Sequence, residues 1–321
     1  MKRLLLLFLL AFTFVLAFTS CSLFEDEKVY YQISESGDYA EVVGYNHATS
    51  LGEVVIKSEY KGKPVTKIAD EAFNQSLDMT SVVIPDSVKV IGKDAFRNSG
   101  ITSLVIGNSV TTIGDGAFSS CGLYSVEIPS SVTSIGEGAF GSNNLTSVTI
   151  PGSVTDIAAS AFAQCEKLSS VVISSGVTSI GREAFAACFA LTSIEIPDSV
   201  TNIEERAFSA CRSLESIVLP NSITSIRHAT FISCESLTSI VIPDTVSSIG
   251  DNAFENCGAL TSIVIPNSVK HIGDCAFLSC SALTDIYYGG SQDKWFEINV
   301  AVNGGAPWAN LTVHYNYVPN E

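Results

Sequence analysis

The residues of this chain best suited to chemistry are its nine cysteines. Cysteines can form disulfides, ligate metals or act as nucleophiles. The sequence has no Cys-x-x-Cys pair and no His-x-x-x-His pair, so a zinc site is not indicated. Most of the cysteines instead share one place in a long-range pattern, three residues after a phenylalanine. They are Cys121, Cys165, Cys188, Cys211, Cys234, Cys257 and Cys280.

The regular spacing of these cysteines favours a ladder of buried, inert thiols. Ser76, Ser99 and Asn143 take the same place in other units, so a thiol is not obligatory there. Free cysteine behaves as a small apolar residue, which suits a buried position. Disulfides between adjacent units, such as Cys257 with Cys280, remain an alternative. A step of about 4.8 Å between units lies within the Cα separation that a disulfide tolerates.

Other catalytic arrangements are not indicated by the sequence. The chain has 4 histidines, and they fall at unrelated positions with no nucleophile beside them. Acidic side chains at turns, such as Asp198, Asp244 and Asp251, lack the dense spacing of a calcium loop and fit solvated turn residues. We therefore predict a protein that is not an enzyme and has no cofactor, no metal site and no catalytic residue.

The N-terminus predicts export. Lys2 and Arg3 precede an apolar run over 4–18, as in a secretory signal. The segment Phe18-Thr19-Ser20-Cys21 resembles a bacterial lipoprotein box, which implies lipid attachment at Cys21 and contact with the membrane through this anchor only. Ordinary cleavage near the same place is the alternative. In either case we expect the protein at the bacterial cell envelope or surface.

A repeat organises the rest of the chain. Phenylalanines, most of them preceded by alanine, recur at intervals of 22 or 23 residues, at Phe73, Phe96, Phe118, Phe140, Phe162, Phe185, Phe208, Phe231, Phe254 and Phe277. Such a period indicates a solenoid, in which each unit is one coil of the chain. One unit cannot enclose its apolar residues, so stacked units must bury them together.

Each unit predicts two short extended segments. In the unit that starts at Leu191, Leu-x-x-Ile-x-Ile alternates apolar and polar residues and ends at Pro197, as a strand would. Asp198-Ser199 is turn chemistry, and Val-x-x-Ile follows as a second extended piece. The Ala-Phe segment is long enough for one helical turn. The fold class is therefore mainly β, with short helical turns.

The repeat also predicts the domain organisation. We assign 1–20 to a signal peptide, 21–29 to a tether, 30–61 to an N-terminal cap, 62–288 to the solenoid and 289–321 to a C-terminal cap. Both caps are rich in aromatic residues, which suits covers for an exposed core. In the C-terminal cap these residues are Trp295, Trp308, Tyr315 and Tyr317.

The repeat unit, Leu-x-x-Ile-x-Ile-Pro-x-Ser-Val-x-x-Ile-Gly-x-x-Ala-Phe-x-x-Cys, resembles the BspA-type (Treponema pallidum-type) leucine-rich repeat. The resemblance covers about Val65 to Tyr288 and extends to Tyr287-Tyr288-Gly289-Gly290-Ser291 at the C-terminal end. It implies a right-handed leucine-rich solenoid at the cell surface. It also implies adhesion to proteins of the host matrix, to host cells or to other bacteria.

The candidate binding residues lie on the outward side of the first strand of each unit, because alternate strand residues point to opposite faces. One column there ends in four adjacent apolar residues, Val218, Val241, Val264 and Tyr287, rimmed by Ser216, Ser239, Ser262 and Asp285. An apolar strip with a polar rim is typical of a contact site. The alternative is that valine is present there only because it favours strands.

The net charge of the chain bears on which class of macromolecule it can bind. The formal net charge is −16, and phosphate binding needs a basic face, so we predict no nucleic-acid partner. Besides adhesion, two functions stay open. A structural envelope protein would self-associate, and the oligomeric state is undetermined by the sequence. A carbohydrate-binding module needs exposed Trp or Tyr along the sheet, which only Tyr124 and Tyr287 offer.

Overall fold

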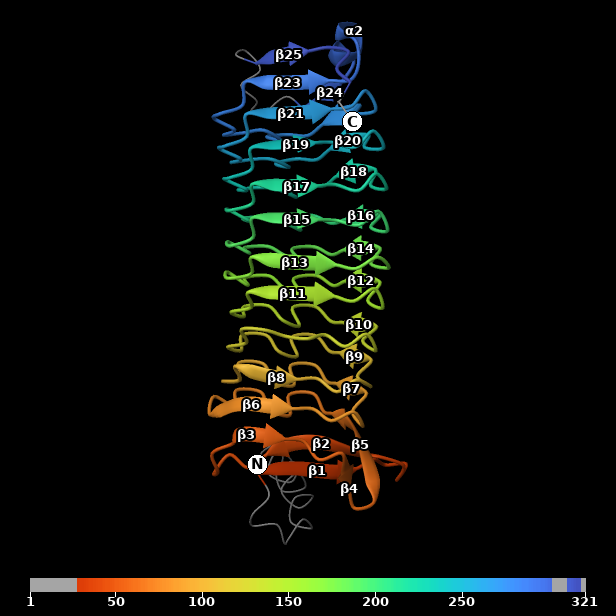
Figure 1. Ribbon diagram of the computed structural model, residues 1–321, viewed down its shortest axis with the longest axis vertical. Helices are drawn as coiled ribbons and strands as arrows, with labels where there is room; N and C mark the ends of the chain where they lie inside the picture. Colours follow the sequence, from red (N-terminus) through yellow and green to blue (C-terminus); the bar gives the residue numbers. More distant parts are fainter. Residues whose placement is uncertain (1–27, 302–310, 319–321) are drawn as a thin grey trace, which may run out of the picture.

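The computed structural model describes residues 28–301 and 311–318, which form one elongated stack of coils (Figure 1). Most coils supply a longer and a shorter strand, and each strand lies beside its counterpart in the next coil. Two rows of parallel strands therefore run along the stack, the long-strand row and the short-strand row. This arrangement confirms a leucine-rich repeat solenoid with coils of about 22 to 23 residues.

The long-strand row comes from the Leu-x-x-Ile-x-Ile segments, as predicted. Strands β19 and β21 pair in parallel with Val241 opposite Val264, and their alternate residues are buried. Residues 123–128 belong to this row but form no regular strand. The row consists of β3 (Gly52–Val55), β6 (Met79–Val83), β8 (Ser103–Val105), β11 (Ser147–Ile150), β13 (Ser170–Ile173), β15 (Ser193–Glu195), β17 (Ser216–Val218), β19 (Ser239–Val241), β21 (Ser262–Ile265), β23 (Asp285–Tyr288) and β25 (Thr312–His314).

The short-strand row comes from the Val-x-x-Ile segments. Its isoleucines point inward and are buried, while the preceding residues are at least partly exposed. The row consists of β5 (Lys63–Ile68), β7 (Val90–Ile91), β9 (Thr112–Ile113), β10 (Ser134–Ile135), β12 (Asp156–Ile157), β14 (Ser179–Ile180), β16 (Asn202–Ile203), β18 (Ser225–Ile226), β20 (Ser248–Ile249), β22 (His271–Ile272) and β24 (Asn299–Val300).

The two ends of the stack depart from the repeat. At the N-terminal end, β1 (Val29–Ile33) pairs with β2 (Ala40–Tyr45) in antiparallel fashion. Strand β2 pairs in parallel with β5, and β4 (Glu59–Tyr60) forms an antiparallel hairpin with β5. At the C-terminal end, the helix α2 (Gln292–Phe296) precedes β24. Strand β3 pairs in parallel with β6 although it lies within 30–61, so the long-strand row reaches into the segment that the sequence assigns to the cap.

The Ala-Phe segments form hydrogen-bonded turns in place of the helical turn that the sequence allowed. Residues two before and two after the phenylalanine have left-handed backbone angles, for example Glu183 (φ 56°) and Ala187 (φ 57°) around Phe185. Their N–H groups, and that of Phe185, donate to carbonyls of the next coil, at 2.8 to 3.1 Å. These donors therefore bond between coils and not along a helix.

The core is a continuous ladder through the stack. The ten repeat phenylalanines are fully buried. Neighbouring rings stack with centroids 5.0 to 5.8 Å apart and planes within 15° of parallel. Tyr45 stacks on Phe73 at 5.9 Å and extends the ladder at its N-terminal end. Each coil thus buries its phenylalanine only because its neighbours cover both faces of the ring.

Candidate binding surface

The structure brings all eight predicted binding residues onto one face of the long-strand row. Glu195 lies opposite Val218, Val241 opposite Val264, and Val264 opposite Tyr287, and strands β17 and β19 are in contact, so Val218 and Val241 lie in neighbouring coils. Val218 is 63% exposed and Val241 is 54% exposed. Ser216 and Ser239 are exposed beside them, whereas Val264, Tyr287, Ser262 and Asp285 are half-buried.

The half-buried members are covered by the C-terminal end of the chain. The Tyr287 ring stacks on His314 of β25, with centroids 4.6 Å apart, and meets the Tyr317 ring at 4.7 Å. His314 Nε2 lies 2.7 Å from Asp285 Oδ1, and this hydrogen bond is the main cause of the lowered pKa of the Asp285 carboxyl group. Asp285 is therefore engaged within the protein, so the exposed part of the strip is centred on Val218 and Val241.

A cavity of about 210 Å³ opens next to this strip. Its apolar floor includes Val241 and Val264, and Tyr317 lines it from the C-terminal end. Asn221 and Asp244, at the turns that follow β17 and β19, also line it. A concave site with an apolar floor and a few polar groups is the usual form of a ligand pocket.

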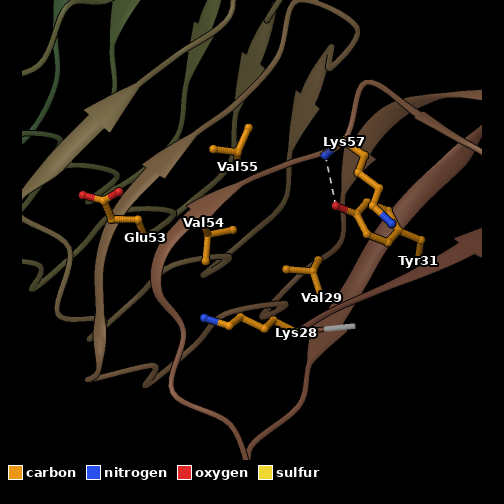
Figure 2. Close-up of a pocket in the computed structure, with 7 residues that line it drawn as sticks. All are labelled: Lys28, Val29, Tyr31, Glu53, Val54, Val55 and Lys57. Carbon is orange, nitrogen blue, oxygen red and sulfur yellow. Dashed lines mark hydrogen bonds between the residues drawn. The ribbon is translucent and has the colours of Figure 1, made fainter. Parts of the chain in front are cut away.

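A second cavity, of about 330 Å³, lies at the N-terminal end between β1 and β3 (Figure 2). Its lysines already contact the protein. Lys28 Nζ donates to the carbonyl of Leu51 at 3.2 Å, and Lys57 Nζ lies 5.5 Å from the centre of the Tyr31 ring. The backbone N–H of Lys57 also donates to Tyr31 Oη at 3.0 Å. The side chains of both lysines are therefore already engaged within the protein.

Sequence reasoning missed two residues of this face, Val55 and Tyr317. Val55 of β3 lies opposite Val83 of β6, is 70% exposed, and extends the outward column by one coil. Val83 and Val105, which the sequence already aligns in this column, are 37% and 53% exposed, so a second apolar stretch lies near the N-terminal end. The spacing Leu51-x-x-Val54-x-Ile56 matches the repeat and is a signal that could have found Val55. Tyr317 follows the last coil, and no repeat spacing points to its position.

The cysteine ladder is buried, as predicted, and has a second role. Cys211 Sγ donates to the Phe185 carbonyl at 3.2 Å, and the other six ladder thiols bond in the same way to the phenylalanine of the preceding coil at 3.1 to 3.4 Å. Asn143 Nδ2 donates to the equivalent Phe118 carbonyl at 2.8 Å. The position therefore favours a buried hydrogen-bond donor as well as a small side chain.

The thiols of the ladder are poor nucleophiles. Burial raises the pKa of Cys121 and Cys165 to about 11, and that of Cys211 and Cys280 to about 12. All cysteines of the described residues are outside disulfides, and no three potential metal ligands gather anywhere in this part of the chain. The thiolate is the reactive form, so these side chains do not suit nucleophilic chemistry near neutral pH.

The predicted lipid-attachment residue, Cys21, lies outside the described residues. Within 28–301 and 311–318, no helix has the length and apolar character needed to cross a bilayer.

Comparison with known proteins identifies the repeat. The BspA type Leucine rich repeat region matches residues 66–190 and 155–284, in 6 copies. A solved leucine-rich repeat protein from Bacteroides ovatus is 30% identical, and the match covers 83% of this chain and 71% of that one with a TM-score of 0.72. A leucine-rich repeat protein from Eubacterium ventriosum shares the fold at 22% identity, 81% and 82% coverage and a TM-score of 0.51. The search of curated proteins gives no match. The family match spans more than half of the sequence, and the chain belongs to the BspA-type leucine-rich repeat family.

Proposed function

We propose that this protein is an exported, non-enzymatic binding protein of the bacterial cell surface. It recognises protein partners through the long-strand row. The observation that carries the proposal is the pair Val218 and Val241, two adjacent valines that are more than half exposed on one rigid face. The chain thus leaves apolar side chains in water where strands β17 and β19 meet, and adjacent exposed apolar residues with a polar rim are typical of contact surfaces.

The partners we propose are proteins of the host matrix, of host cells or of other bacteria. Membership of the BspA-type family supports this class. A solenoid suits such a role because its stacked coils form an extended, rigid surface for contact without a deep catalytic cleft.

The experiment compares two lysine variants in the same column. The double variant Val218→Lys, Val241→Lys places charges in the apolar strip. The control Val172→Lys changes a valine that is 53% exposed at the same strand position, between Thr149 and Glu195. Binding to a panel of immobilised extracellular-matrix proteins should fall at least tenfold for the double variant and stay within twofold for the control. If the folded double variant captures the matrix proteins as well as the parent protein does, the proposal is wrong.

A structural envelope protein remains the second candidate, because exposed apolar strips also suit contact between copies of one chain. Light scattering of the purified protein over a range of concentrations separates the two functions. A monomer that captures matrix protein supports adhesion, whereas assembly into larger species without capture supports the structural role.

We further propose that Cys21 carries the lipid that holds the protein at the envelope. The box Phe18-Thr19-Ser20-Cys21 supports this attachment. Cells that express the protein and are fed labelled palmitate should label it, and Cys21→Ala should lose label and membrane retention together. Retention of both in Cys21→Ala would contradict a lipid at this cysteine.

A further inference from the structure

The cavity beside Tyr317 is lined by apolar, aromatic and acidic residues. Val241 and Val264 are apolar lining residues, Tyr317 is an aromatic one, and Asn221 and Asp244 are residues with an amide and a carboxylate. The volume of about 210 Å³ suits one side chain of a partner and not a large cofactor. Three kinds of contact, apolar, aromatic and anionic, therefore converge on one small space.

The carboxylate of Asp244 is unpaired among the described residues, unlike its equivalents in other coils. Asp86 Oδ1 accepts the N–H of Asn108 in the next coil at 2.6 Å, and Asp198 Oδ1 accepts that of Asn221 at 3.3 Å. Asp244 is exposed, and no ion pair or hydrogen bond joins its carboxylate to another described residue. Its negative charge is thus available to a ligand.

Several basic residues of these coils already have partners within the protein, among them Lys270, whose Nζ donates to the carbonyl of Asn267 at 2.6 Å. Arg227 pairs with Glu204 at 3.0 Å, and Arg212 Nε pairs with Glu235 at 3.4 Å. No lysine, arginine or histidine lines the cavity. The charge at this site therefore favours a cationic ligand over an anionic one.

Tyrosine beside a carboxylate is also suited to a cation. A cation within about 6 Å of a ring centre is attracted by the π-face, and arginine can add a bidentate bond to a carboxylate. The protein uses the first of these contacts on the same row, where Lys167 Nζ lies 5.5 Å from the centre of the Tyr124 ring. The methylene stem of such a side chain would lie on apolar surface, here the valine floor.

We propose that this cavity binds the guanidinium group of an arginine presented by an extended, basic segment of a partner protein. The proposal rests on the proposed function and names the chemistry of the partner. Asp244 pairs with the guanidinium, the Tyr317 ring stacks on it, and Val241 contacts its stem. The net charge of −16 favours approach of such a basic partner.

The test uses two peptides that differ in one group. The first is fluorescein-labelled Gly-Ser-Gly-Val-Arg-Val-Gly-Ser-Gly, and the second has citrulline, which is neutral and of nearly the same shape, in place of arginine. Fluorescence anisotropy with the purified protein should show the arginine peptide binding at least tenfold tighter. The advantage should decrease when salt is raised, because the added contact is ionic.

Three variants locate the site. Asp244→Asn should reduce the advantage of arginine to less than twofold, and Tyr317→Leu should reduce it severalfold, while Tyr317→Phe should retain it. The matched control is Asp86→Asn, which changes the same turn position in a coil whose residues do not line the cavity. Equal binding of the two peptides, or a full arginine advantage in Asp244→Asn, overturns the proposal. A third outcome also overturns the proposal. If a methyl hexoside binds, Tyr317→Leu abolishes that binding and the arginine peptide does not bind, the cavity is a carbohydrate site.

The outcomes also separate this proposal from the proposed function. Matrix-protein capture that is unchanged in Asp244→Asn, with equal binding of the two peptides, leaves the adhesive role standing and removes the arginine pocket. Selective binding of the arginine peptide without capture of any matrix protein keeps the arginine pocket and contradicts the adhesive role.

Discussion

At the scale of single residues, the cysteine ladder determines the reactivity of the interior. The ladder cysteines are buried thiols, and their pKa values are raised by burial, so few thiolates exist near neutral pH. Native protein at pH 8 should therefore leave the seven ladder thiols unlabelled by maleimide, whereas denatured, unreduced protein should label all of them. Mass spectrometry counts the labels. If the number of labels on the denatured protein rises only after a reductant is added, the cysteines of neighbouring coils are joined by disulfides.

The same thiols predict how stability depends on pH. An unfolded thiol ionises near pH 9, whereas in the folded protein the pKa of Cys121 is about 11 and that of Cys211 about 12. Above pH 9 the unfolded chain thus loses protons that the folded chain keeps, and the free energy of unfolding falls as pH rises. The slope is about 1.4 kcal/mol per pH unit for each such thiol. The ladder's contribution is fully present below pH 9 and is lost towards pH 12.

Urea unfolding at pH 8, 9, 10 and 11 measures this dependence. The variant Cys211→Ser keeps a hydrogen-bond donor but has no group that ionises in this range, so its stability should fall less steeply than that of the parent. If the free energy of unfolding falls equally with pH in the two proteins, the Cys211 thiol does not contribute to the pH dependence of stability.

At the scale of elements, the turn around each phenylalanine contains alanines whose replacement by glycine should raise the free energy of unfolding. Ala187 and Ala210 both have φ of 57°, a left-handed conformation that costs a residue with a Cβ about 1–2 kcal/mol. Ala187→Gly and Ala210→Gly should therefore each raise the free energy of unfolding by up to about 1 kcal/mol, after the entropy cost of glycine. In a helix the same change would lower it.

Urea midpoints at an unchanged m-value measure this effect. The matched control is Ala207→Gly, at a fully buried alanine that directly precedes Phe208 and is absent from the left-handed positions. This variant should lose stability. If all three variants lose stability alike, the left-handed assignment is contradicted.

The strands could be predicted from the sequence, and the turns could not. Leu-x-x-Ile-x-Ile alternates at the period of a strand, and its inward residues, such as Ile240 and Ile242, are buried as that period requires. The Ala-Phe segment has no comparable signal. Its left-handed positions hold Gly116 and Asn252 in some units but Glu183, Ala187 and Arg206 in others, so no residue type that favours φ above zero recurs there in every unit. Hydrogen bonds to the next coil fix these angles, and a local sequence pattern does not record such bonds.

At the scale of the whole molecule, the repeat determines how much of the binding face the sequence predicts. A fixed period aligns equivalent residues, so Val218, Val241 and Val264 could be placed in one column before any coordinates were known. Tyr317 comes after the last coil and returns over that column, where its ring contacts Tyr287. The cavity depends on this return of the chain, which the period does not determine.

The stacking of coils predicts that one whole coil can be removed. Deletion of residues 191–213, one 23-residue unit, joins coils whose strands and phenylalanines remain in phase, so that Phe185 should stack on Phe231. Each coil contacts only its neighbours, so the remaining protein should unfold cooperatively at a modestly lower temperature. Its length in small-angle scattering should decrease by about 4.8 Å. Deletion of 191–201, about half a coil, shifts every later inward residue out of phase and should prevent folding. Equal loss of structure in both deletions, measured by circular dichroism, would show that the coils are not interchangeable units.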